Sequence, residues 1–135
     1  MTRFYDIDEA NAAVLELEAI AVVLAEQRAE LVRLRDHALA RSPGVGHDVE
    51  PLSDDELRTL RLRMQGLVDQ MAAGVSRIDQ LGLTLRDIET GLVDFPALVS
   101  GRQVWLCWRR GEPAVEWWHE LDSGFSGRRP LSELS

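Results

Sequence analysis

The chain of 135 residues contains no lysine, only one cysteine and few aromatic residues. Its 15 basic residues are all arginine and are outnumbered by 23 acidic residues, which leaves a net charge of −8. This balance argues against nucleic acid and against an anionic membrane surface as partners, because both are bound through basic patches. We interpret the absence of lysine as codon bias of a GC-rich bacterial genome. The single cysteine, Cys107, has no partner for an internal disulfide, which is typical of a reducing compartment.

Long apolar runs are also absent, since no stretch approaches the roughly 18 apolar residues that a transmembrane helix requires. The first residues, MTRFYDIDEA, lack the charged and then apolar pattern of a secretory signal. We therefore expect a cytoplasmic protein, and its length fits a single domain over residues 1–135.

Glycine and proline are missing from residues 6–41, where apolar side chains recur at helical spacing. We predict one long helix over this segment. Asp6 and Glu9 have the spacing of a capping box, in which each side chain accepts a hydrogen bond from the other residue's main-chain N–H. One face of the helix follows a heptad repeat, as in a coiled coil.

Two prolines and two glycines then interrupt the chain at residues 42–52, which we predict to be a loop. A second helix is predicted over residues 53–82, with Ser53 and Glu56 at capping-box spacing and a clearer heptad repeat. Gly74 lies on the heptad seam, so we expect the two helices to approach each other closely there. Together the helices form an antiparallel hairpin.

A hairpin of two helices has a single seam and cannot enclose a hydrophobic core. Its apolar stripe must be covered by the C-terminal segment, by a second copy of the chain, or by both. We therefore expect a homodimer in which two hairpins form a four-helix arrangement, with another protein partner as the alternative.

All four tryptophans lie in two aromatic and β-branched segments, residues 102–109 and 114–121, which are predicted as strands joined by a hairpin loop. With a shorter strand before them, they make a small antiparallel sheet within residues 91–121. The remaining residues, 122–135, are expected to form a loop and tail. The predicted fold class is therefore α+β: a long helical hairpin with a small sheet packed against it.

Pairing Arg109 with Ala114 sets the register of the two aromatic strands, and alternation then divides their side chains between two faces. The more apolar face is expected to pack on the helices and comprises Val104, Leu106, Trp108, Val115, Trp117 and His119. The opposite face comprises Gln103, Trp105, Cys107, Glu116, Trp118 and Glu120.

Four polar residues from separate segments of the C-terminal region form a candidate ligand site: Asp94, Glu112, His119 and Arg128. Histidine and carboxylates are metal ligands, but no His-Glu-x-x-His motif or cysteine pair accompanies them. The structural alternative is a histidine hydrogen-bonded to a carbonyl or to an acid such as Asp94. The segment GFSGRR fits an anion-binding nest, or else two turns with an arginine paired to an acid.

Cys107 is predicted to be a structural cysteine, because the register above places Glu116 opposite it and His119 on the other face, with no base beside the thiol. Trp105 and Trp118 are expected to be cross-strand neighbours on the less apolar face. An exposed tryptophan pair is typical of a protein interface, and cover by the C-terminal tail is the alternative.

The segments GLVDFPA, LCWRRGEP and WWHELDSGFSGRRPL, together with the opening from Tyr5 to Asn11, resemble an uncharacterised prokaryotic family, domain of unknown function 2203. The resemblance covers nearly the whole chain, and Asp6 stands where that family often has threonine. It implies the architecture described above and no particular activity.

The sequence favours an interaction or assembly module that self-associates through the helical hairpin and the tryptophan-rich strands. The alternative is a protein that binds a small anion or a metal ion at Asp94, Glu112, His119 and Arg128, with enzymatic activity left open. No catalytic residue, metal ligand or cofactor is assigned.

Overall fold

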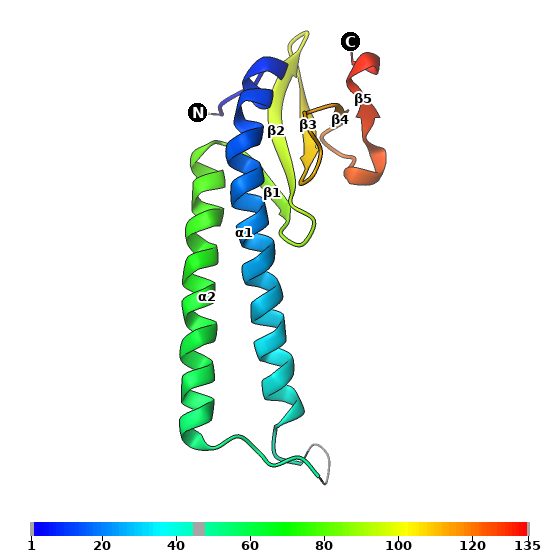
Figure 1. Cartoon of the computed structure of the whole chain (residues 1–135). Helices are drawn as coiled ribbons and strands as arrows, with labels where there is room; N and C mark the ends of the chain where they lie inside the picture. Colours follow the sequence, from blue (N-terminus) through cyan, green and yellow to red (C-terminus); the bar gives the residue numbers. More distant parts are fainter. Residues whose placement is uncertain (1, 45–47, 135) are drawn as a thin grey trace.

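A computed structural model describes residues 2–44 and 48–134, so part of the predicted 42–52 loop lies outside the described residues. Two antiparallel helices, α1 (Ile7–Ala40) and α2 (Asp54–Gln80), lie side by side, and a sheet packs beside the first turns of α1 (Figure 1). Its strands are β1 (Thr84–Asp87), β2 (Leu92–Val99), β3 (Arg102–Arg109), β4 (Trp117–His119) and β5 (Arg129–Pro130). Two short 3-10 helices, Phe125–Gly127 and Leu131–Glu133, flank β5. The predicted α+β fold class is confirmed.

Both helices begin where their capping boxes predict. The Asp6 carboxylate accepts a hydrogen bond from Glu9 N at 2.7 Å, and the Glu9 carboxylate accepts one from Asp6 N at 3.3 Å. Ser53 and Glu56 make the same reciprocal pair, with both distances at 3.1 Å. Neither helix in the described part of the chain combines the length and apolar character that crossing a membrane requires.

The helices approach closely at Gly74, as the heptad pattern predicts. A Cβ atom at Gly74 would lie 2.9 Å from Cδ2 of Leu24, which is buried in the seam. The N-terminal segment ties the helices to the sheet. Tyr5 N donates a hydrogen bond to Pro96 O at 2.8 Å, and the Tyr5 ring packs edge-on against Phe95.

The five strands follow one another in sequence order as an antiparallel meander. We call the side of the sheet that packs on α1 the inner face and the other side the outer face. The inner face carries the apolar core residues Val93, Phe95, Ala97, Val104, Leu106, Trp108 and Trp118. The sheet extends beyond the predicted range 91–121 at both ends, because β1 precedes it and β5 lies within the predicted tail 122–135.

The predicted register between the two aromatic strands is wrong by one residue. β3 and β4 pair Trp105 with His119, Leu106 with Trp118 and Cys107 with Trp117. Because side chains alternate along a strand, a slip of one residue moves every β4 side chain to the other face. Trp118 therefore lies in the core, whereas His119 and Trp117 lie on the outer face beside Cys107 and Trp105.

The physical reason for the slip lies in the loop between the strands. The prediction allowed four residues for this loop, but β4 begins only at Trp117. Val115 N donates a hydrogen bond to the Asn11 side chain of α1 at 2.7 Å, and the Val115 side chain is buried in the core. The residues before Trp117 are thus held by α1 and do not pair with β3.

Candidate functional site

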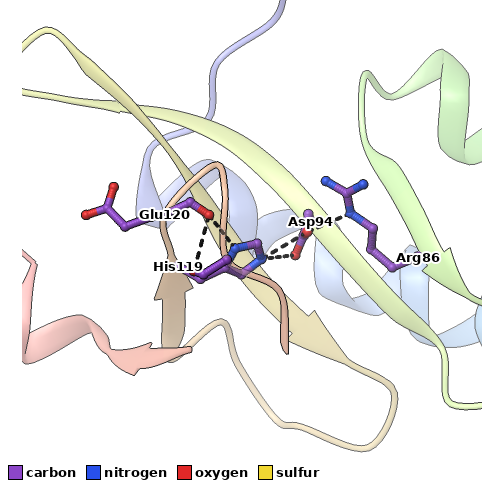
Figure 2. A network of polar contacts seen from close by, with 5 residues as sticks. Arg86, Asp94, His119 and Glu120 are labelled. Carbon is purple, nitrogen blue, oxygen red and sulfur yellow. Dashed lines mark hydrogen bonds and ion pairs between the residues drawn. The ribbon is translucent and has the colours of Figure 1, made fainter. Parts of the chain in front are cut away.

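The outer face of the sheet carries a buried ion-pair network centred on Asp94 and His119 (Figure 2). Asp94 comes from the middle of β2 and is 1% exposed, and His119 ends β4 and is 3% exposed. His119 Nε2 lies 3.1 and 3.0 Å from the two carboxylate oxygens of Asp94. Arg86 approaches Asp94 from the opposite side, and its Nε donates to Oδ2 at 2.8 Å. The structure thus brings together two of the four predicted site residues.

The hydrogen bonds of the His119 ring determine what lies between the ring and Asp94. Nδ1 is 2.8 Å from the main-chain oxygen of Glu120. A carbonyl oxygen only accepts hydrogen bonds, so Nδ1 carries a hydrogen. Nε2 faces two carboxylate oxygens, which also only accept. A proton or another cation must therefore lie between Nε2 and Asp94.

Cys107 belongs to the same site, contrary to the predicted separation of Cys107 from His119. It is opposite Asp94 in the β2–β3 register and is fully buried. Its Sγ, a carboxylate oxygen of Asp94 and a ring nitrogen of His119 all lie within 4.8 Å of one another. We call these three residues the outer-face cluster. Burial raises the pKa of the Cys107 thiol to about 12, and the Asp94 carboxylate adds to this rise. Without a bound cation beside its sulfur, Cys107 is therefore a poor nucleophile.

Glu112 and Arg128, the other two predicted site residues, bind each other. An Arg128 guanidinium nitrogen donates to Glu112 Oε2 at 2.7 Å, and Glu112 Oε1 accepts from the main-chain N–H of Arg109 at 2.7 Å. The Arg128 guanidinium stacks over Trp117 and Phe125, 4.7 Å from each ring centre. The predicted four-residue site is therefore divided into two pairs, Asp94 with His119 and Glu112 with Arg128. Cys107 lies near both pairs, because Arg128 lowers the pKa of its thiol and Glu112 raises it.

A cavity of about 350 Å³ adjoins the outer-face cluster. Asp94 and His119 form part of its wall, and the chain that follows β4 supplies Leu121, Asp122, Ser123, Gly124 and Phe125. The loop after β4 therefore lies next to Asp94 and His119, and the cavity between them has space for a small ion or molecule.

Trp105 and Trp118 do not form the predicted exposed pair. Trp105 is opposite His119 and is half-buried under the Arg86 guanidinium, which lies 5.0 Å from the ring centre. Trp118 is 2% exposed, and its indole N–H donates to Pro130 O at 3.1 Å. Trp118 is a core residue, so a protein interface on the tryptophan-rich strands could include Trp105 but not Trp118.

The chain matches the family described as "Uncharacterized conserved protein (DUF2203)" over residues 3–131. It belongs to the DUF2203 family. This match confirms the family resemblance inferred from the sequence. No curated protein and no solved structure matches this DUF2203 chain. All three residues of the outer-face cluster lie within residues 3–131, the part of the chain that matches the family.

Proposed function

We propose that this protein is an assembly module that forms a homodimer through the distal half of its helical hairpin, residues 28–40 of α1 and 54–68 of α2. α1 extends for about 50 Å at 1.5 Å per residue. The sheet covers only the part of α1 near its start, and the hairpin continues beyond it (Figure 1). Most of the core residues of α1, from Ala10 to Leu24, lie in the covered part.

A groove in the distal half carries this proposal. It has a volume of about 580 Å³ and is lined by Leu31, Val32, Arg35, Arg61, Met64, Gln65 and Val68. Val68 is 45% exposed in the single chain. A second hairpin in this groove would bury these apolar side chains and convert the open seam into a four-helix arrangement. Isologous contacts of this kind are the commonest route to a stable homodimer.

Substitution of a groove residue tests the dimer without disturbing the fold of the monomer. Val68→Glu places a charge in the groove at an exposed helical position, so we expect the mass measured by sedimentation equilibrium at micromolar concentration to fall from dimer to monomer. Leu15→Glu is the matched control, because Leu15 is 85% exposed on the part of α1 beside the sheet. A wild-type protein that is strictly monomeric would contradict the proposal, and so would a Val68→Glu variant that remains dimeric.

The tryptophan-rich strands support self-association less than the hairpin does, since Trp118 is in the core. We also propose that the protein works in the cytoplasm of a bacterium. Cys107 is a free, buried thiol, which fits a reducing compartment, and the lack of lysine fits a GC-rich genome.

Binding of a small anion at Arg128 is the second proposed function. Arg128 Nε is buried and has no hydrogen-bond partner among the residues that the structure describes. We expect the anion to bind weakly, because Glu112 already neutralises the Arg128 guanidinium and competes with the anion for it. Thermal unfolding in phosphate and in acetate, compared between the wild type and Arg128→Gln, tests this function. Equal shifts in both proteins, or none in either, would contradict it.

A further inference from the structure

Three side chains with metal-binding atoms converge on the outer face of the sheet, and none of them belongs to the hairpin groove. From their convergence we propose that the outer-face cluster of Asp94, Cys107 and His119 binds a divalent transition-metal ion. The ligands would be one carboxylate oxygen, the Cys107 thiolate and Nε2 of His119. Three protein ligands leave a further coordination position for water or another small ligand.

The orientation of the His119 ring is that of a metal ligand. Its Nδ1–H donates to the main-chain oxygen of Glu120, so Nε2 presents its lone pair toward Asp94 unless a second proton occupies it. Metal-binding histidines almost always donate their other ring N–H to a carbonyl or carboxylate in this way. The bond to Glu120 therefore selects the tautomer that coordination requires.

Asp94 is also held as a ligating carboxylate is. Arg86 donates to Oδ2 of Asp94, which orients the carboxylate and leaves its oxygens directed toward His119. In a tetrahedral zinc site with bonds of about 2.0 to 2.3 Å, ligand atoms are about 3.3 to 3.8 Å apart. Nε2 lies 3.0 and 3.1 Å from the Asp94 oxygens, so a small outward movement of the two side chains would reach that spacing.

Cys107 distinguishes a metal site from a purely structural ion pair. A proton between Asp94 and His119 accounts for those two residues, but it gives no role to a buried sulfur within 4.8 Å of both. Coordination uses the thiolate of Cys107 and the lone pair of His119 Nε2, so a divalent ion would take the place of hydrogen on these atoms. A sulfur, nitrogen and oxygen donor set favours zinc, iron(II) or cobalt(II) over magnesium or calcium.

The adjoining cavity gives an ion a route to the cluster and space for another ligand. Asp122 and Ser123 lie in its wall together with Asp94 and His119. Water, or an oxygen of a small molecule in this cavity, would complete the coordination. Catalytic zinc sites have this composition, with three protein ligands and one exchangeable position.

Cobalt(II) titration of the whole chain, purified without a metal-chelating tag, tests the inference directly. We expect one cobalt ion per chain, with visible bands of tetrahedral coordination and a near-ultraviolet thiolate-to-metal band, and we expect zinc to displace it. Cobalt binding without the thiolate band, or no binding, would overturn the proposal. This readout uses the wild-type protein and so does not depend on the folding of any variant.

Two substitutions locate the ion. Cys107→Ser removes the thiolate and should abolish the near-ultraviolet band and weaken binding by at least the 10- to 100-fold that loss of an outer-shell partner costs. His37→Gln is the matched control, because it removes an exposed histidine of α1 outside the cluster and should leave the affinity unchanged. If His37→Gln rather than Cys107→Ser weakens binding, the ion is on the helical surface and the proposal fails.

Discussion

Both faces of the sheet contain buried side chains, but these side chains are stabilised in different ways. The inner face packs apolar side chains such as Phe95 and Leu106 against α1. The outer face buries Asp94 and His119, whose charges and hydrogen bonds must be satisfied by each other and by Arg86. Apolar contacts can be lost one at a time, whereas a buried polar group that loses its partner retains the full cost of its burial. The faces should therefore respond differently to substitution.

The largest loss of stability is expected on the inner face. Phe95→Ala removes a fully buried aromatic ring and should lower the free energy of unfolding by about 3 to 5 kcal/mol. Leu98→Ala is the matched control on the same strand, since Leu98 is 51% exposed and its loss should cost less than about 0.5 kcal/mol. Urea unfolding monitored by tryptophan fluorescence measures both, and similar losses would contradict the assignment of the faces.

On the outer face, single substitutions should be costly and non-additive. His119→Ala leaves Asp94 buried with only the half-exposed Arg86 as partner, so we expect a loss of about 3 kcal/mol, the low end for a broken buried pair. Asp94→Ala should cost a similar amount. The double variant should cost clearly less than the sum, because neither charge is then left alone. Additive losses in urea unfolding would show that the pair is not coupled.

Alkaline pH should lower the free energy of unfolding through the outer face, because Cys107 is buried there. Its pKa of about 12 in the folded protein is above the ordinary value of 9.0, so the folded state holds the thiol proton more tightly. This stabilisation is complete below pH 9.0 and is lost as the pH rises toward 12, by up to about 1.4 kcal/mol per pH unit.

The comparison of wild type with Cys107→Ser isolates this contribution, because other titrating groups, including Tyr5 with its raised pKa, are common to both proteins. With a chelator present, the free energy of unfolding of the wild type should fall more steeply above pH 9.0 than that of the variant. Parallel pH profiles would contradict the buried thiol.

The helical hairpin was predicted closely because its signals are local. Asp6 and Ser53 cap helices whose apolar pattern is continuous, and Gly74 marks the close approach on the seam. The sheet was predicted less completely. β1 and β5 are only four and two residues long, too short for a pattern of alternation to stand out from the surrounding turns.

The presence of Cys107 in the site could not be predicted, because it depends on a contact between residues that are far apart in the sequence. Asp94 and His119 were correctly placed among the candidate residues, but the bond from Val115 to Asn11 of α1 lengthens the hairpin loop and shifts the register by one residue. That shift brings His119 to the face of Cys107. An acid within the apolar strand LVDFPALV was the available signal, since a buried carboxylate requires partners on its own face.

The smallest effect is expected where the outer-face network reaches solvent. Arg86 and Arg102 have similar exposures, 43% and 47%, and each forms an ion pair and stacks over a tryptophan. Their carboxylate partners differ, because Asp94 is 2% exposed and Glu120 is 36% exposed. Arg86→Gln should therefore cost about 1 kcal/mol, and Arg102→Gln about 0.5 kcal/mol or less.

High salt should reduce the cost at Arg102 more than the cost at Arg86, because exposed charges are screened more strongly than buried ones. Urea unfolding of both variants at low and high salt measures this difference. If Arg102→Gln costs as much as Arg86→Gln in both conditions, burial of the carboxylate contributes nothing to the strength of the pair. The contrast between the faces would then rest on the pairing of Asp94 with His119 alone.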